Sequence, residues 1–361
     1  MTIKPALKYG VSILPPSNTA EIRIGSRFRS FALPSSWSNL STRHLIELFN
    51  GQRTISTIAR ESGITEAAVQ SLVDELSSHS LIDLYRTPIS YLRRYDPELG
   101  RIEEVHDLDE RADDYAAESF LRRMEIECNA VTQNPGDHDG GRTAVLERRN
   151  FPILIFGHGK IVNALVGVLS ASGFSEISTV NRVSSKDPSL KISEGDIAGG
   201  FIGSRDIGQS RKKLLEELRN ISSLFVSPKP FISSPKLIIS IGVPSPDSLQ
   251  RWMMESSPHL LVEIPTPNEA RIGPFVIPGK SPCARCVQLA EGITIPNSER
   301  CDVGAAFSLA ISSAIALDVI SIADRKTSNY LSTSYIYSSR QFHQPEIQHW
   351  SQHHACGCTW S

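Results

Sequence analysis

Residues 151–181 read F-P-I-L-I-F-G-H-G-K-I-V-N-A-L-V-G-V-L-S-A-S-G-F-S-E-I-S-T-V-N, and this stretch determines the expected fold class. A buried-type strand at 151–156 is followed by a glycine turn, a helix at 161–172 and a second strand at 177–181. Two strands joined through one helix are typical of a parallel sheet with Rossmann-like topology. The pattern predicts an α/β domain that begins at residue 151.

The chain from there to residue 361 continues the same pattern. Residues 237–241 and 260–264 predict two more buried strands, and residues 303–324 predict a long apolar helix. We therefore expect one α/β domain over residues 151–361.

Residues 1–88 predict a smaller domain of a different type. Residues 22–32 read I-R-I-G-S-R-F-R-S-F-A, and their alternation predicts one strand of a small sheet. Three helices and a short closing strand follow, at residues 40–50, 54–61, 65–79 and 81–84. This order predicts a winged helix-turn-helix. Residues 89–150 are polar and predict a helical connector between the two domains.

The composition limits the possible partners and compartments. The chain has 361 residues and a net charge of −2, so it has no broad positive field to attract nucleic acid. Residues 1–13 lack the apolar run of a signal peptide, and serines and an aspartate interrupt the apolar stretch 305–323. We expect a cytoplasmic protein without a membrane span. Its six cysteines then indicate metal ligands or free thiols rather than disulfides.

Four of these cysteines form two close pairs that lie far apart in the sequence. Cys283 and Cys286 make a C-x-x-C pair, and Cys356 and Cys358 make a C-x-C pair. Four thiolates complete a tetrahedral zinc shell and leave no open position for water. The spacing predicts one structural zinc site, and the alternative is four unrelated buried thiols.

The glycine turn is a candidate nucleotide site. Gly157 and Gly159 lie between a predicted strand and a predicted helix, where nucleotide phosphates bind in related folds. The third glycine of the usual fingerprint would fall at residue 162 or 163, and the acidic ribose ligand would fall at Asn181; none of these positions has the expected residue. A nucleotide site and a turn that only needs two small residues both stay open.

A peptide site is the candidate in residues 1–88. The helix predicted at 65–79 has acidic residues and no Lys or Arg, which disfavours DNA reading in the major groove. A winged helix can instead bind an extended peptide between its sheet edge and its third helix. The predicted contacts are Arg27, Phe28, Arg29, Phe31, Val69, Leu72 and Val73. The alternative for the arginines is a solvated outer face of a strand.

Several segments resemble known families. Residues 48–55, L-F-N-G-Q-R-T-I, with the helix that follows and residues 76–81, resemble the PqqD-like recognition domain of precursor-peptide maturation enzymes. Residues 272–286 closely resemble the GP-x-V-x-PG-x-x-PC-x-x-C segment of ThiF-like proteins that accompany YcaO cyclodehydratases in thiazole/oxazole-modified microcin and thiopeptide biosynthesis. Residues 353–358, H-H-A-C-G-C, resemble the H-P-x-C-G-C ending of the same proteins, and residues 206–211 resemble a D-x-G-x-x-K/R segment of the ubiquitin-activating-enzyme superfamily.

The resemblance implies a protein that binds the leader of a ribosomal precursor peptide and delivers it to a separate YcaO cyclodehydratase, which uses ATP to form azoline rings. It also implies structural zinc and a possible homodimer. The chain departs from ATP-using relatives at Asn163 and Asn181, and at residues 242–244, where Gly-Val-Pro stands in place of an expected aspartate. We therefore expect poor ATP use or none, with only weak nucleotide contacts from Gly157, Gly159 and Arg211.

Two other functions stay open. The first is an ATP-dependent ThiF-like enzyme that adenylates a peptide carboxylate, with Arg205 and Arg211 added to the two glycines as phosphate ligands. The second is a DNA-binding regulator with a metal-sensing domain, which the near-neutral charge disfavours.

Overall fold

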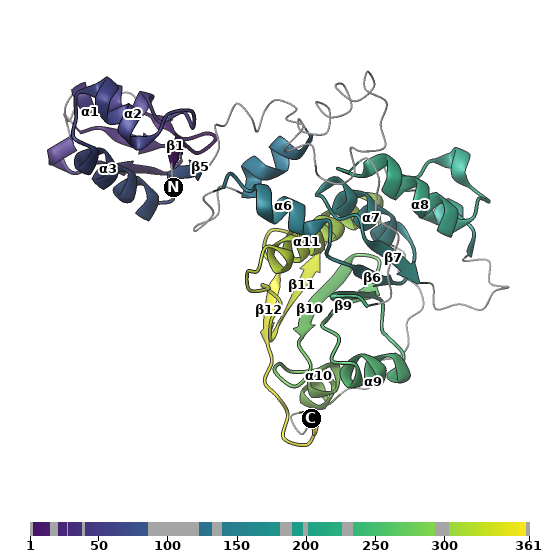
Figure 1. The fold of residues 1–361 in the computed structure, drawn as a ribbon. Coiled ribbons are helices and arrows are strands. Elements are labelled where there is room, and N and C mark those ends of the chain that lie inside the picture. The colour runs from purple at the N-terminus through teal and green to yellow at the C-terminus, as the bar shows by residue number, and fades with distance from the viewer. Residues whose placement is uncertain are drawn as a thin grey trace. The chain divides into compact units, whose positions relative to one another are not determined.

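The computed structural model describes residues 3–14, 21–26, 28–37, 40–85, 123–131, 139–180, 190–197, 201–225, 234–292 and 303–358. The chain divides into two compact units, residues 1–146 and residues 147–361 (Figure 1). Two residues named above, Arg27 and Asn181, lie outside the described residues.

A mixed seven-stranded sheet organises the second unit. Its strand order is β12-β11-β10-β9-β8-β6-β7. The four strands β7, β6, β8 and β9 are parallel, and the remaining pairs toward β12 are antiparallel. The strands are β6 Ile153–Phe156, β7 Ile177–Val180, β8 Leu237–Ile241, β9 His259–Thr266, β10 Glu269–Val276, β11 Thr333–Ser338 and β12 Glu346–His349.

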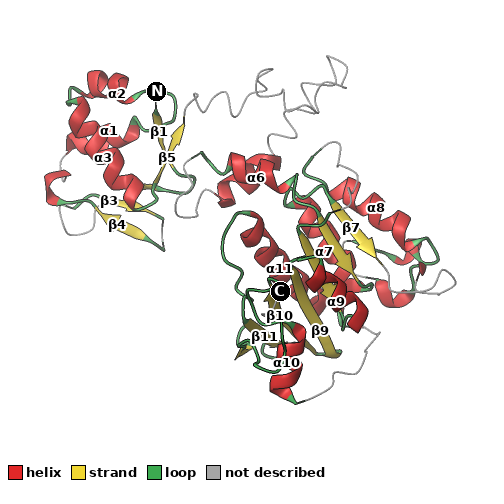
Figure 2. Cartoon of the chain, turned by 60° about the horizontal axis from the view of Figure 1, so that its bottom comes forward, coloured by secondary structure: helices red, strands yellow, loops and turns green. Residues whose placement is uncertain are grey.

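Helices cover both faces of this sheet, as Figure 2 shows with strands in yellow and helices in red. Apolar residues of α7, α8 and α11 form one core with the sheet, and α9 and α10 form a second core with residues such as Leu154, Ile238 and Leu261. All of β8 is buried. The helices are α6 Arg142–Arg148, α7 Lys160–Ala171, α8 Arg211–Ser222, α9 Pro246–Met254, α10 Ala284–Glu291 and α11 Ala305–Ala323.

Helix α11 is long and apolar enough to cross a membrane by length and composition alone. In the structure, Phe307, Ile311, Ile315 and Val319 of this helix belong to the core that it shares with α7 and the sheet. Its apolar composition is therefore accounted for by packing inside the α/β domain.

Among the described residues, the part of the first unit up to residue 85 contains two small sheets and three α-helices. β1 pairs with β5 in antiparallel fashion, and β3 lies between β2 and β4 in a second antiparallel sheet. Thr54 and Thr65 cap the second and third helices through their side-chain oxygens, and Gly63 ends the second helix in a left-handed conformation. The elements are β1 Lys4–Leu7, β2 Ser12–Ile13, β3 Arg23–Gly25, β4 Ser30–Ala32, α1 Leu40–Glu47, α2 Ile55–Ser62, α3 Glu66–Ser78 and β5 Ile82–Tyr85.

The single strand predicted at residues 22–32 is wrong, because the chain forms a hairpin there. β3 ends at Gly25, and the Ser26 amide donates to the carbonyl of Arg29, which closes the turn. A Cβ atom at Gly25 would lie 2.2 Å from that same carbonyl oxygen, so the close approach requires glycine. As a result, Ile24 is buried in the core whereas Phe28 is 90% exposed.

A buried histidine begins β9 in the second unit. His259 is fully buried, and its Nδ1 atom lies 2.9 Å from the carbonyl oxygen of Ser257, so this nitrogen carries the proton. Its Nε2 atom is buried without a hydrogen-bond partner among the described residues. Burial is the main cause that lowers the pKa of His259 from 6.5 to about 4.

We predict that His259 makes the stability of the second unit sensitive to acid. Between pH 6.5 and about 4 the unfolded chain binds a proton at this position and the folded chain does not, so the free energy of unfolding falls as the pH falls. From about pH 7 to about pH 5, the loss should be roughly 2 kcal/mol larger in the parent than in His259→Asn, which keeps a donor for Ser257 but does not titrate. Chemical unfolding at both pH values measures this, and equal losses would contradict it.

Candidate functional site

The turn from β6 to α7 brings the backbone close to a neighbouring strand. Gly157 and Gly159 have φ angles of 126° and 95°, which favour glycine. A Cβ atom at Gly157 would lie 2.7 Å from the carbonyl oxygen of Ile241, at the end of β8. The Gly157 amide also donates to the carbonyl of Val180, at the end of β7. The turn therefore fits between the ends of three strands only because residue 157 lacks a side chain.

This turn lies at the switch point of the parallel sheet. The chain passes from β6 to β7 on one side and places β8 on the other side of β6. Open α/β sheets bind ligands at such points, outside the carboxyl ends of the strands. Two helices begin there, α7 at Lys160 and α9 at Pro246, and helix N-termini favour anions. The geometry suits a phosphate-containing ligand.

Lys160 adds a cation to this end of the sheet. It is the first residue of α7, is half-buried, and donates from Nζ to the carbonyl of Val303, 3.0 Å away. The position was not predicted from the sequence. The sequence did contain one indication of it, because Lys160 directly follows the G-x-G turn, and phosphate-binding loops can have a lysine close to their glycines.

Arg211 does not face an open phosphate site in this structure. Its two terminal nitrogens lie 2.7 Å from the two carboxylate oxygens of Asp196, and it also donates to the carbonyl of Lys191. Both partners of this ion pair are almost fully buried. Burial opposes ionisation of Asp196, but hydrogen bonds from Arg211 and Ser193 and the Arg211 charge together lower its pKa. Arg211 therefore anchors the segment before α8. Arg205, the other arginine predicted as a phosphate ligand, is exposed, and its Nε atom lies 3.7 Å from a carboxylate oxygen of Asp206.

The four cysteines come together as one cluster. The Sγ atoms of Cys283, Cys286, Cys356 and Cys358 all lie within 4.8 Å of one another. The Cys283–Cys356 and Cys286–Cys358 separations are 3.4 Å, and the Cys283–Cys286 separation is 3.8 Å. Four sulfurs bound to one tetrahedral zinc ion at 2.3 Å would be about 3.8 Å apart. The four thiols therefore fit a zinc ion. A zinc ion bound by all four would have no position left for water, so the site would be structural.

Local structure positions each pair of thiols. Cys283 is the N-cap of α10 and Cys286 lies in its first turn, whereas the second pair follows β12. The backbone amide of His353 donates to Sγ of Cys286, 3.3 Å away. Burial raises the pKa of the Cys283 thiol. Burial also opposes ionisation of Cys286, but hydrogen bonds from the His353 and Cys283 backbones and from neighbouring thiols outweigh it and lower the pKa of Cys286.

The residues predicted to bind a peptide divide into two groups in the first unit. Phe28 and Arg29 are exposed, and Phe31 is half-buried on β4, the outer strand of its described sheet. Phe31 stacks on His79, after the end of α3, with ring centroids 3.6 Å apart. In contrast, the α3 residues Val69, Leu72 and Val73 are at most 1% exposed. These three belong to the core of the unit and do not present a surface to a peptide.

Comparison with known proteins identifies the fold. No protein-family model matches the sequence, and no curated protein is similar to it at a significant level. Among solved structures, E. coli MccB with ATP has a TM-score of 0.65 at 13% identity, and MccB with AMPCPP and MccA has 0.64 at 14%; both alignments cover 99% of each chain. The heterocyclase TruD has a TM-score of 0.55 at 10% identity, covering 99% of this chain and 43% of TruD. The chain therefore has a ThiF-like α/β fold like that of MccB, with a four-cysteine cluster.

These comparisons contradict the main functional prediction, delivery of a leader peptide to a separate YcaO cyclodehydratase. The MccB structures match this chain over nearly the full length of both proteins; MccB is described as a microcin C7 biosynthetic enzyme, and this similarity favours the adenylating alternative. The expectation of poor or absent ATP use is also unsupported, because the same fold holds ATP in MccB. That expectation rested on departures at single fingerprint positions, which do not by themselves exclude a nucleotide site.

We predict that Cys283→Ser releases zinc and destabilises the second unit. Loss of one thiolate opens a closed structural site, so the free energy of unfolding should fall by about 3 kcal/mol or more. Zinc per chain by mass spectrometry and the midpoint of thermal unfolding measure the effect. Cys128→Ser, which changes a buried cysteine of the first unit, should leave the zinc content unchanged. Normal zinc content in Cys283→Ser would show that the cluster is not the metal site.

Proposed function

We propose that this protein is an ATP-dependent enzyme that adenylates a carboxylate of a peptide. The observation that supports this most strongly is the end-to-end fold similarity to MccB in complexes with ATP, AMPCPP and MccA, together with the glycine turn at the switch point of the sheet. In such a reaction a carboxylate oxygen attacks the α-phosphorus of ATP. The new C–O–P linkage forms as the bond between the α- and β-phosphates breaks, and pyrophosphate leaves.

The residues at the carboxyl ends of β6 and β8 would bind the phosphates in this proposal. Backbone amides at the start of α7 point toward the switch point, and Lys160, whose Nζ donates to the carbonyl of Val303, is the first residue of that helix. Positive charge at this place stabilises the negative charge that accumulates on the leaving pyrophosphate. Gly157 matters because it lets the turn approach β8, which keeps the start of α7 at the ends of the strands.

The first unit would recognise the peptide. We propose that residues 1–88 act as a winged-helix recognition domain that binds an extended segment between the outer edge of β4 and the C-terminal half of α3. The exposed Arg29 and the stacked pair of Phe31 and His79 border this place, and Glu75 lies 3.7 Å from His79. Main-chain pairing to a strand edge supplies affinity, and neighbouring side chains supply specificity.

ATP with Mg²⁺ should raise the unfolding midpoint of the intact protein, because a ligand that binds only the folded state stabilises it. ATP–pyrophosphate exchange should depend on peptides that have a free carboxylate and should be lost when those carboxyls are amidated. Lys160→Ala should reduce exchange by about 10-fold or more, since it removes a cation beside the phosphates.

Lys236→Ala is the matched control, because Lys236 directly precedes β8 at the opposite end of the parallel strands. It should keep the exchange activity. Absence of any thermal shift at millimolar ATP would contradict the proposed enzyme, whereas equal exchange in Lys160→Ala and the parent would contradict the role of Lys160 at the phosphates.

Peptide recognition can be tested without a known substrate. We predict that peptides selected by display on the intact protein lose about 10-fold or more in affinity for Arg29→Glu, since a reversed charge at the β4 edge repels acidic side chains. Arg60→Glu is the control, because Arg60 is an exposed residue of α2 in the same unit. Fluorescence polarisation measures both affinities, and equal losses would argue against the β4 edge.

A further inference from the structure

The outer edge of β7 has backbone groups that face away from the sheet. β7 is the last strand in the order of the seven-stranded sheet and pairs with β6. The amides of Ile153 and Gly157 donate to the carbonyls of Glu176 and Val180. Because backbone groups alternate along a strand, residues 177 and 179 direct their amides and carbonyls outward. Within the described part of the chain, no strand pairs with this edge.

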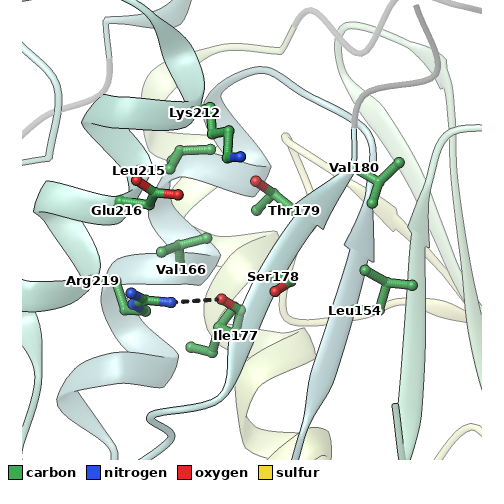
Figure 3. A pocket seen from close by; sticks show the side chains of 10 residues that line it. All are labelled: Leu154, Val166, Ile177, Ser178, Thr179, Val180, Lys212, Leu215, Glu216 and Arg219. Carbon is green, nitrogen blue, oxygen red and sulfur yellow. Dashed lines mark hydrogen bonds between the residues drawn. The ribbon is translucent and has the colours of Figure 1, made fainter. Parts of the chain in front are cut away.

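A pocket of about 260 Å³ follows this edge (Figure 3). All four residues of β7 and one side of α8 line it, together with Leu154 of β6 and Val166 of α7. Successive residues of a strand point to opposite faces, so a pocket lined by all four must enclose the edge of the strand rather than one face. Small-molecule sites usually range from about 300 to 1,000 Å³, so this pocket is smaller than a typical cofactor site. Its place and size suit an extended main chain.

The charge of the pocket is set by α8. Lys212, Glu216 and Arg219 occupy one side of the helix and line the pocket, so two cations accompany one carboxylate. Arg219 donates from Nη1 to the outward carbonyl of Ile177, 3.3 Å away. Its Nε atom is buried and has no hydrogen-bond acceptor among the described residues. The pocket therefore offers positive charge and an unused donor beside an open strand edge.

We propose that the edge of β7 binds an extended acidic peptide segment as an additional strand, with Lys212 and Arg219 contacting its carboxylates. The added strand pairs with the outward amides of residues 177 and 179 and with the outward carbonyl of residue 179, while Arg219 keeps the carbonyl of Ile177. An acidic side chain on the face toward α8 meets the two cations, and basic segments are disfavoured there. A second copy of β7 is a poorer occupant, because a two-fold pairing would bring the basic side of α8 toward its own copy.

The experiment uses the intact protein and two fluorescein-labelled peptides, Val-Glu-Val-Glu-Val-Glu and Val-Lys-Val-Lys-Val-Lys, in polarisation titrations without ATP. The acidic peptide should bind at least about 10-fold more tightly than the basic one. Lys212→Glu should weaken the acidic peptide about 10-fold. Lys213→Glu makes the same charge change one residue along α8, outside the pocket lining, and should change the affinity less than about twofold.

Three results would overturn the proposal. One is equal weakening by Lys212→Glu and Lys213→Glu, which would indicate only a diffuse positive field. Another is no binding of the acidic peptide at millimolar concentration, which would mean that the cations only protect an exposed edge against aggregation. The third is a homodimer, seen by analytical ultracentrifugation, that Lys212→Glu dissociates while peptide binding is unchanged. The Lys212→Glu comparison is repeated in an Arg29→Glu background, which removes acidic-peptide binding at the β4 edge of the first unit, and the roughly 10-fold weakening should persist there.

Discussion

The α/β unit depends on the complete burial of β8. All five residues of this strand are buried, and it pairs with β6 on one side and β9 on the other. A parallel strand that is buried on both faces requires a helical layer on each face. One layer contains α7 and α11, and the other contains α9 and α10. The glycine turn at the end of β6 and the cysteine cluster at α10 are therefore both positioned by the packing of helices on the two faces of the sheet.

The candidate phosphate site and the cysteine cluster obtain their geometry by different means. At the turn, backbone proximity does the positioning, because the missing side chain of Gly157 lets α7 begin next to the end of β8. At the cluster, side chains from two distant segments meet, and four soft ligands in a closed shell suit a structural ion. Arg211 belongs to neither arrangement, since its buried pair with Asp196 fixes the segment that leads into α8. The turn and the cluster are therefore positioned by different kinds of contact.

Local sequence signals predicted the parallel part of the fold well. The strand at residues 237–241 matches β8, and the predicted helix at 161–172 is shifted by one residue from α7. The cysteine spacing was sufficient to predict the cluster, because two close pairs of soft ligands seldom arise by chance in a chain with six cysteines.

Other features depend on contacts between distant residues, which a local pattern does not contain. The antiparallel strands β10 to β12 were not predicted, and the pairing of β10 with β11 joins segments that lie far apart in the sequence. Val69, Leu72 and Val73 are buried although they were predicted to contact a peptide, because helical spacing identifies an apolar face without showing that α3 packs against α2 and β5. The stack of Phe31 on His79 joins residues from a strand and a helix end, so it too required the structure.

The cysteine cluster also affects how the edge of the sheet can open. The two sulfurs of each 3.4 Å contact are separated by 72 or 73 residues, and that interval contains α11 and the edge pair β11 and β12. An edge hairpin ordinarily frays first, because only one side of it is paired. Here the chain leaving β12 returns to α10, so a metal-filled cluster closes the hairpin into a loop anchored at both ends. With an ion bound to all four cysteines, opening of this edge would leave the end of β12 anchored to α10 through the metal–thiolate bonds.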